Sequence, residues 1–179
     1  KIILASTSPR RQQILAEAGV AFEVVASSYE EDMTLPMRPA ELAKYLSKGK
    51  ADAVAKEYPD AVIVAADTFI AFEDRVLGKP HTAARAKETL SMLSGKPHSV
   101  ITGFTIIDTT SGRVISEAVE SKVFFKELSE QDIDDYIATG EPLDKAGAYA
   151  IQGIGKGLVD HIEGDYNNIV GLPVSAVVE

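Results

Sequence analysis

The sequence contains no cysteine, and this absence excludes several kinds of chemistry. No disulfide framework, thiol nucleophile or thiolate metal site can be built from this chain. Only three histidines occur, and they form no cluster along the sequence. The fold must therefore rest on a hydrophobic core, for which 179 residues are enough. A chain without disulfides is compatible with a reducing compartment, and we expect a cytoplasmic protein.

Positive charge is also scarce, since 18 lysines and arginines face 27 acidic residues and the net charge is -9. Such a surface repels nucleic acid, so we expect no nucleic-acid partner, and a local basic cluster would have to hold any anionic ligand. No apolar run approaches the ~20 residues of a membrane span, so we expect no membrane partner. The first apolar stretch, 2–5, is too short for a signal-peptide core. Because the chain starts at Lys1 without a methionine, we expect a few further residues at its ends.

What the sequence does contain is an alternation of β-rich and helical segments, which predicts an α/β fold. The apolar run 61–66 predicts a central strand covered on both faces. Residues 100–107 and 113–125 predict two long strands of a hairpin. Helices are predicted over 10–18, 39–57, 82–93 and 129–137. No repeat or linker divides the chain, so we expect a single domain over residues 1–179.

The stretch STSPRRQ, from Ser6 to Gln12, lies between a predicted strand and a predicted helix. Free amide groups at a helix N-terminus attract anions, and serine hydroxyls there can cap the helix or bind phosphate. Arg10 and Arg11 could hold phosphate oxygens through two parallel hydrogen bonds. A well-capped helix with two solvated arginines fits the same local pattern equally well.

Two groups of carboxylates follow predicted strands. Asp67 comes directly after the strand 61–66, where ligands of α/β sheets gather, and it could bind magnesium or act as a general base. An Asx-turn or a helix cap is the alternative role. The run YEED follows the second predicted strand, 22–26, and Glu31 (or Glu30) could complete a magnesium site with Asp67. A solvated acidic loop is the other interpretation of that run.

Further candidates are two lysines and a glutamine. Lys79 lies in a predicted turn and Lys50 on a predicted helix, so either could meet a phosphate or simply be solvated. The stretch 141–153 is rich in small residues, which let a backbone approach a ligand closely. Gln152 in that stretch carries both a donor and an acceptor, so it could read the edge of a base.

The motifs STSPRR, YEED, AADT, GKP, SGKPH, GEPLDKAGAYAIQG and NNIVGLP occur in one order over nearly the whole chain. That order resembles the Maf family of nucleotide pyrophosphatases, often labelled septum formation proteins. The resemblance implies a fold similar to the inosine triphosphate pyrophosphatases: an elongated mixed sheet with flanking helices, in two lobes around a cleft. It implies hydrolysis of a nucleoside triphosphate substrate to the monophosphate and pyrophosphate, with a divalent metal cation, Mg²⁺ or Mn²⁺. A homodimer is compatible with the family.

The resemblance also implies roles for individual residues. Asp67 matches the catalytic base and a metal ligand, and Glu31 matches its acidic metal-binding partner. A metal-bound Asp67 would be a weak base, so its alternative role is chiefly that of a metal ligand. The positions that match polar groups around the triphosphate are Ser6, Arg11, Lys50 and Lys79. The positions that match base choice are Arg10, Thr68 and Gln152.

These last positions are typical of the subgroup that prefers dTTP and UTP, rather than the one that prefers 7-methyl-GTP. Two other functions stay open at this point. The first is a nucleotide-binding regulator of cell division without significant turnover. The second is a pyrophosphatase for modified nucleotides or for purine nucleotides such as deaminated ones.

Overall fold

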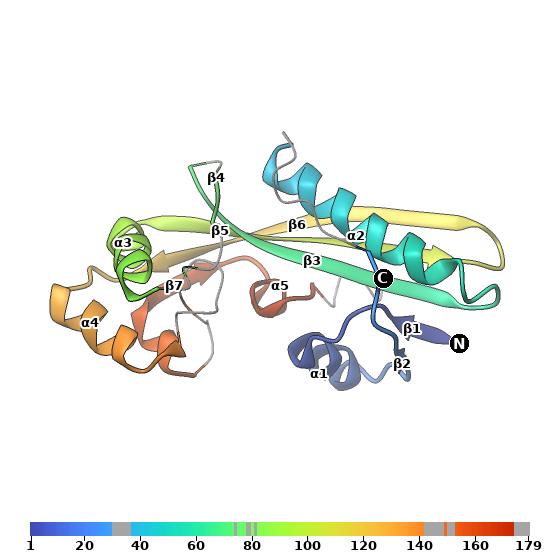
Figure 1. Ribbon diagram of the computed structural model, residues 1–179, viewed down its shortest axis with the longest axis horizontal. Helices are drawn as coiled ribbons and strands as arrows, with labels where there is room; N and C mark the ends of the chain where they lie inside the picture. Colours follow the sequence, from blue (N-terminus) through green and yellow to red (C-terminus); the bar gives the residue numbers. More distant parts are fainter. Residues whose placement is uncertain are drawn as a thin grey trace. The chain divides into compact units, whose positions relative to one another are not determined.

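A computed structural model describes residues 1–29, 37–73, 75–77, 80, 82–141, 149 and 153–173. Figure 1 shows the elements along the chain. In order they are β1 (Ile2–Leu4), α1 (Pro9–Glu17), β2 (Glu23–Val24), α2 (Pro39–Ala55), β3 (Val62–Phe72), β4 (Arg75–Leu77), α3 (Ala83–Leu93), β5 (Pro97–Asp108), β6 (Arg113–Phe125), α4 (Glu130–Ala138), the 3-10 helix η3 (Gly153–Leu158), β7 (Val159–Glu163) and α5 (Tyr166–Val170).

The strands form one seven-stranded mixed sheet in the order β2-β1-β3-β5-β6-β7, with β4 paired to β3. β1 lies parallel to both of its neighbours, so that Leu4 is opposite Val24 and Val64. β4 pairs antiparallel with the end of β3, and β7 pairs antiparallel with β6. The predicted α/β class with flanking helices is therefore confirmed. The two lobes around a cleft stay a prediction.

Tertiary contacts divide the chain into two compact units. The first comprises Lys1–Thr68, Ile101–Glu120 and Asp165–Glu179, and the second comprises Phe69–Val100 and Ser121–Gly164. The single domain over 1–179 stays a prediction.

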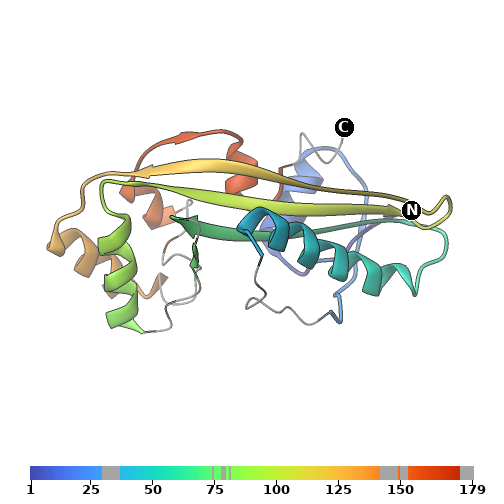
Figure 2. The ribbon, with the colours of Figure 1, turned by 90° about the horizontal axis from the view of Figure 1, so that it is seen from above.

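The core of the first unit lies between the sheet and α2. Side chains of β1, α2, β3 and β5 form its buried apolar cluster, which includes Ile3, Ala51 and Ile63. A Cβ atom added at Gly103 would overlap the main chain of Ala43, so β5 and α2 approach closely at this glycine. Figure 2 shows α1 and α2 on opposite sides of the strands of this unit, as Figure 1 does.

In the second unit α3 and α4 lie side by side (Figures 1 and 2). A capping box starts α4: the Ser129 hydroxyl accepts from the Asp132 amide, and the Asp132 carboxylate accepts from the Ser129 amide. The buried rings of His98, Phe125 and Tyr149 meet edge to face. The Tyr149 hydroxyl lies 2.6 Å from Nε2 of His98.

The strand that carries Asp67 was predicted to end at Ala66, and this prediction is wrong. β3 continues without a break from Val62 to Phe72, so Asp67 and Thr68 lie within the strand. Asp67 and Thr68 can lie within a strand because side chains from other elements form hydrogen bonds with their polar groups. The strand predicted over 22–26 is also shorter than expected, since β2 has only two residues. The helix α5 was not predicted from the sequence.

Candidate active site

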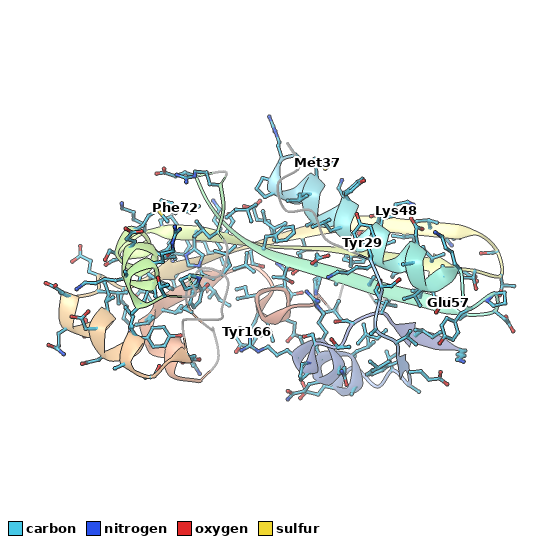
Figure 3. All side chains as sticks on the ribbon, in the orientation of Figure 1. Tyr29, Met37, Lys48, Glu57, Phe72 and Tyr166 are labelled. Atoms are coloured by element: carbon cyan, nitrogen blue, oxygen red, sulfur yellow. The ribbon has the colours of Figure 1, made fainter. Side chains whose placement is uncertain are left out.

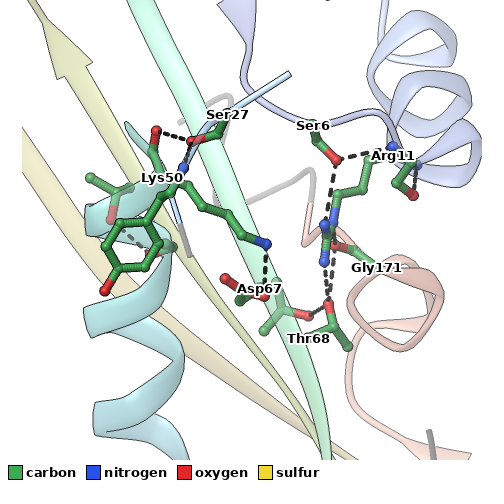
Figure 4. A network of polar contacts seen from close by, with 12 residues as sticks. Ser6, Arg11, Ser27, Lys50, Asp67, Thr68 and Gly171 are labelled. Carbon is green, nitrogen blue, oxygen red and sulfur yellow. Dashed lines mark hydrogen bonds and ion pairs between the residues drawn. The ribbon is translucent and has the colours of Figure 1, made fainter. Parts of the chain in front are cut away.

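The candidate site is a network of polar side chains within the first unit. Figure 4 shows these side chains, which come from separate parts of the chain. Ser6 comes from the loop after β1, Arg11 from α1, Lys50 from α2, and Asp67 and Thr68 from β3. The structure thus brings together five of the residues that the sequence singled out.

Ser6 and Ser8 shape the start of α1. Ser8 caps the helix, since its hydroxyl accepts a hydrogen bond from the Arg11 amide, and Pro9 occupies the first turn. The Ser6 hydroxyl accepts from the Ser8 amide at 3.1 Å and from Nη1 of Arg11 at 3.5 Å. Both lone pairs of Ser6 are thus engaged, which leaves its proton to donate to a ligand oxygen.

Arg11 is held by groups from several parts of the chain, so it is not the solvated arginine of the alternative interpretation. Its Nε donates to the carbonyl of Gly171 at 2.8 Å, and its Nη2 donates to the Thr68 hydroxyl at 3.1 Å. The guanidinium therefore has a defined orientation. Arg10 is half-buried on the same helix, but the described residues do not bring it into this network.

Lys50 and Asp67 form a largely buried ion pair. The Lys50 Nζ lies 2.9 Å from Oδ1 of Asp67, and 17% and 7% of the two side chains are exposed. Removing two charges from water is unfavourable, and close pairing offsets that penalty. The segment after β2 is fastened to α2 here, because the Ser27 hydroxyl donates to the Lys50 carbonyl at 3.0 Å. Tyr29 lies against the same helix, with its ring over Gly49 (Figure 3).

The network also includes residues for which the sequence analysis predicts no role. The hydroxyls of Thr68 and Thr102 lie 2.8 Å apart, and Thr102 donates to the Asn168 carbonyl at 3.0 Å. Asn168 and Gly171 belong to the motif NNIVGLP, which was noted for its order in the chain alone. Its glycine was the signal that could have suggested a close approach of main chain to a functional side chain.

The described residues fit a divalent cation only in part. Asp67 is the carboxylate of the described network, and no group of three or more acidic or histidine side chains in the described part of the chain is placed so that it could hold a metal ion. Magnesium takes one or two carboxylates and completes its coordination with water or phosphate oxygens, so Asp67 suits one such position. The buried carboxylate of Asp67 pairs with the ammonium group of Lys50, so the surroundings of this carboxylate already accommodate a positive charge.

Three predicted site residues, Glu31, Lys79 and Gln152, lie outside the described residues. No helix among the described residues is long and apolar enough to cross a membrane.

Comparisons with known proteins agree on one family. The family model described as Maf-like protein matches residues 1–179. A protein of Bacillus cereus (strain ATCC 10987 / NRS 248) named dTTP/UTP pyrophosphatase is 48% identical over 178 residues, covering 99% of this chain and 87% of its own. A protein of Bacillus anthracis with the same name is 47% identical and is covered over 92% of its length.

A solved structure supports the fold alone. The Staphylococcus aureus Ham1 protein matches 88% of this chain and 79% of its own, with a TM-score of 0.51 and 13% sequence identity.

Proposed function

The chain belongs to the family of Maf-like proteins, and on this premise we propose that it is a nucleoside triphosphate pyrophosphatase that hydrolyses dTTP and UTP. The products are the nucleoside monophosphate and pyrophosphate. Relatives at 47–48% identity over nearly the full chain carry the name dTTP/UTP pyrophosphatase. The observation that carries the proposal is the buried Lys50–Asp67 pair beside the anchored Arg11, which combines cationic groups with a carboxylate.

We place the triphosphate against the cationic side of the network. Arg11 and Lys50 supply positive charge, and the Ser6 hydroxyl proton is directed to a phosphate oxygen. Groups fixed before the substrate arrives stabilise the charge that develops on the leaving pyrophosphate without rearranging. Lys79 is proposed to bind the same phosphates, and Arg10, Thr68 and Gln152 to contact the base.

Asp67 is proposed to orient the attacking water and to accept its proton. The water oxygen bonds to the α-phosphorus while the bond from that phosphorus to the oxygen bridging to the β-phosphate breaks. Pyrophosphate leaves with the electron pair. Lys50 holds the carboxylate through Oδ1 and limits the directions in which Asp67 can face. The protein supplies no covalent nucleophile, so positioning and electrostatics carry the reaction.

Asp67 and Glu31 are the residues that we propose would hold a divalent cation, Mg²⁺ or Mn²⁺. When bound, the cation would neutralise charge on the phosphate oxygens. We also propose that the protein acts in the cytoplasm. We further propose that it forms a homodimer, and sedimentation of the purified chain would test this oligomeric state.

The test is pyrophosphate release from dTTP, UTP, CTP, GTP, ITP and 7-methyl-GTP, each with Mg²⁺ or Mn²⁺. Wild type is compared with Asp67→Asn and with the control Asp52→Asn, whose carboxylate pairs with Lys48 on the surface of α2. We expect turnover of dTTP and UTP, a kcat about 100- to 10,000-fold lower in Asp67→Asn, and little change in the control.

Other outcomes of the same experiment are decisive. Preferred turnover of 7-methyl-GTP or ITP would overturn the assigned substrates but keep the reaction. Near-normal turnover in folded Asp67→Asn would remove this carboxylate from the mechanism. Thermal stabilisation by nucleotides without any pyrophosphate would favour a binding protein over an enzyme.

A further inference from the structure

Thr102 lies at the buried end of the polar network and has no role in the function proposed above. Its side chain is fully buried on β5, and its hydroxyl has two oxygen neighbours. One is the hydroxyl of Thr68 at 2.8 Å, and the other is the carbonyl of Asn168 at 3.0 Å. Thr68 in turn accepts from Nη2 of Arg11. Four groups therefore form a continuous chain of hydrogen bonds.

The number of protons fixes the direction of this chain. A guanidinium only donates and a carbonyl only accepts, whereas each threonine hydroxyl has a single proton. If Thr102 donates to the Asn168 carbonyl, Thr68 must donate to Thr102. The alternative acceptor for Thr68 is the carbonyl of Gly171 at 3.3 Å, which is the longer contact and already accepts from Nε of Arg11 at 2.8 Å. The shorter contacts therefore run from Arg11 through Thr68 and Thr102 to Asn168.

The two carbonyls that receive these hydrogen bonds are themselves fixed. Asn168 is fully buried, and its side-chain amide donates to the Val119 carbonyl at 3.1 Å. Gly171 has a φ of 148°, which favours glycine, and the amides of Gly171 and Leu172 both donate to the Asn167 carbonyl. The main chain of 167–172 is thus a rigid base for the network.

We propose that Thr102 is a positioning residue, which fixes the phosphate-binding guanidinium of Arg11 through Thr68 and against the carbonyls of Asn168 and Gly171. This role rests on the proposed function, because Arg11 is assigned to the triphosphate there. Hydrogen bonds that run in one direction polarise one another, so loss of the last hydroxyl weakens each of the earlier ones. The motif NNIVGLP then supplies the carbonyl groups that hold Arg11 of STSPRR directly and Thr68 of AADT through Thr102.

The first test replaces the hydroxyl with a methyl group of the same shape. Thr102→Val is compared with Thr102→Ser, which restores the hydroxyl. The matched control is Thr105→Val, another fully buried threonine of β5, whose hydroxyl bonds to Ser47 and Ser116 outside the network. We expect Thr102→Val to lower kcat for dTTP about tenfold with a smaller change in KM, because the charge of Arg11 remains while its orientation is lost. Thr102→Ser and Thr105→Val should stay within about twofold of wild type.

A double-mutant cycle separates positioning from general loss of stability. If the chain is continuous, Thr68→Val already breaks it, and adding Thr102→Val should lower kcat/KM by less than about twofold further. Multiplying effects, or an equal loss in Thr105→Val, would overturn the proposal. So would a change confined to KM.

A readout without turnover keeps the two proposals distinguishable. In ¹⁵N NMR spectra, the Nη2 protons of Arg11, one of which donates to Thr68, should exchange with water at least about tenfold faster in Thr102→Val than in wild type or Thr105→Val. Unchanged exchange would overturn the positioning role even in an active enzyme. Faster exchange in a protein that releases no pyrophosphate would refute the proposed function and keep the hydrogen-bond chain.

Discussion

Lys50 and Asp67 lie 17 residues apart in the sequence, yet their charged atoms are 2.9 Å apart in the first unit. α2 presents the lysine and β3 presents the aspartate, so the packing of the helix on the sheet determines the pair. Because both side chains are largely buried, neither charge can be removed without leaving the other in a poorly solvated position.

Lys50→Met should therefore lower the free energy of unfolding by about 3 kcal/mol, since the largely buried Asp67 loses the cationic group that lies 2.9 Å from it. Lys48→Met is the matched control on the same helix. Lys48 pairs with Asp52 at 2.7 Å, but both side chains are about half exposed, and such surface pairs contribute little. Urea denaturation of the two variants checks the difference, and equal losses would contradict a buried pair.

Divalent cations should stabilise the protein through Asp67. In the absence of nucleotide, saturating Mn²⁺ should raise the melting temperature of wild type by about 3 °C, because a ligand that binds the folded state stabilises it. Asp67→Asn should lose that shift and Asp52→Asn should keep it. Differential scanning fluorimetry with and without EDTA makes the measurement, and a shift that survives in Asp67→Asn would place the cation elsewhere.

His98 should make the stability of the protein depend on pH. Burial lowers its pKa from the ordinary value of 6.5 to about 4, so the folded state resists protonation while the unfolded state does not. The contribution of His98 to stability should stay constant above pH 6.5 and fall as the pH drops toward 4, by up to about 3 kcal/mol. Unfolding free energies measured between pH 7 and 4.5 should show this slope.

The variant His98→Gln should flatten that slope by removing the titrating ring. His161→Gln is the control, since that histidine is exposed on β7 beside Asp160. The slope of the control should match that of wild type in the same window. An unchanged slope in His98→Gln would show that other groups cause the pH dependence.

Gly103→Ala should destabilise the protein by about 3 kcal/mol, because the added methyl group meets the main chain of Ala43 on α2. Gly157→Ala is the control, since a Cβ atom there would meet no atom within 4 Å. Chemical denaturation of both variants tests the close approach of β5 and α2. A loss of less than about 1 kcal/mol at Gly103 would mean that the helix can shift away.

Local sequence signals accounted for the elements that carry the site. Pro9 and Ser8 marked the start of α1, and the apolar run before Asp67 marked the central strand β3. The order of the motifs predicted the family, which the comparisons confirm. The roles of Glu31, Lys79 and Gln152 stay predictions. The error at Asp67 arose because two polar residues after an apolar run resemble a strand end, whereas Lys50, Thr102 and Arg11 satisfy them within the strand.

The sequence by itself determined the fold class and the chemical types of the site residues, since periodicity, capping and motif order are local properties of the chain. Only the tertiary structure decided how these groups are paired. The Arg11 side chain donates a hydrogen bond to the carbonyl of Gly171, which lies 160 residues away in the sequence. In the sequence Thr102 is an ordinary β-branched residue of a predicted strand, and only the structure shows that its hydroxyl lies 2.8 Å from that of Thr68. Such hydrogen bonds depend on which surfaces pack together, and no periodicity within a short window of sequence encodes that choice.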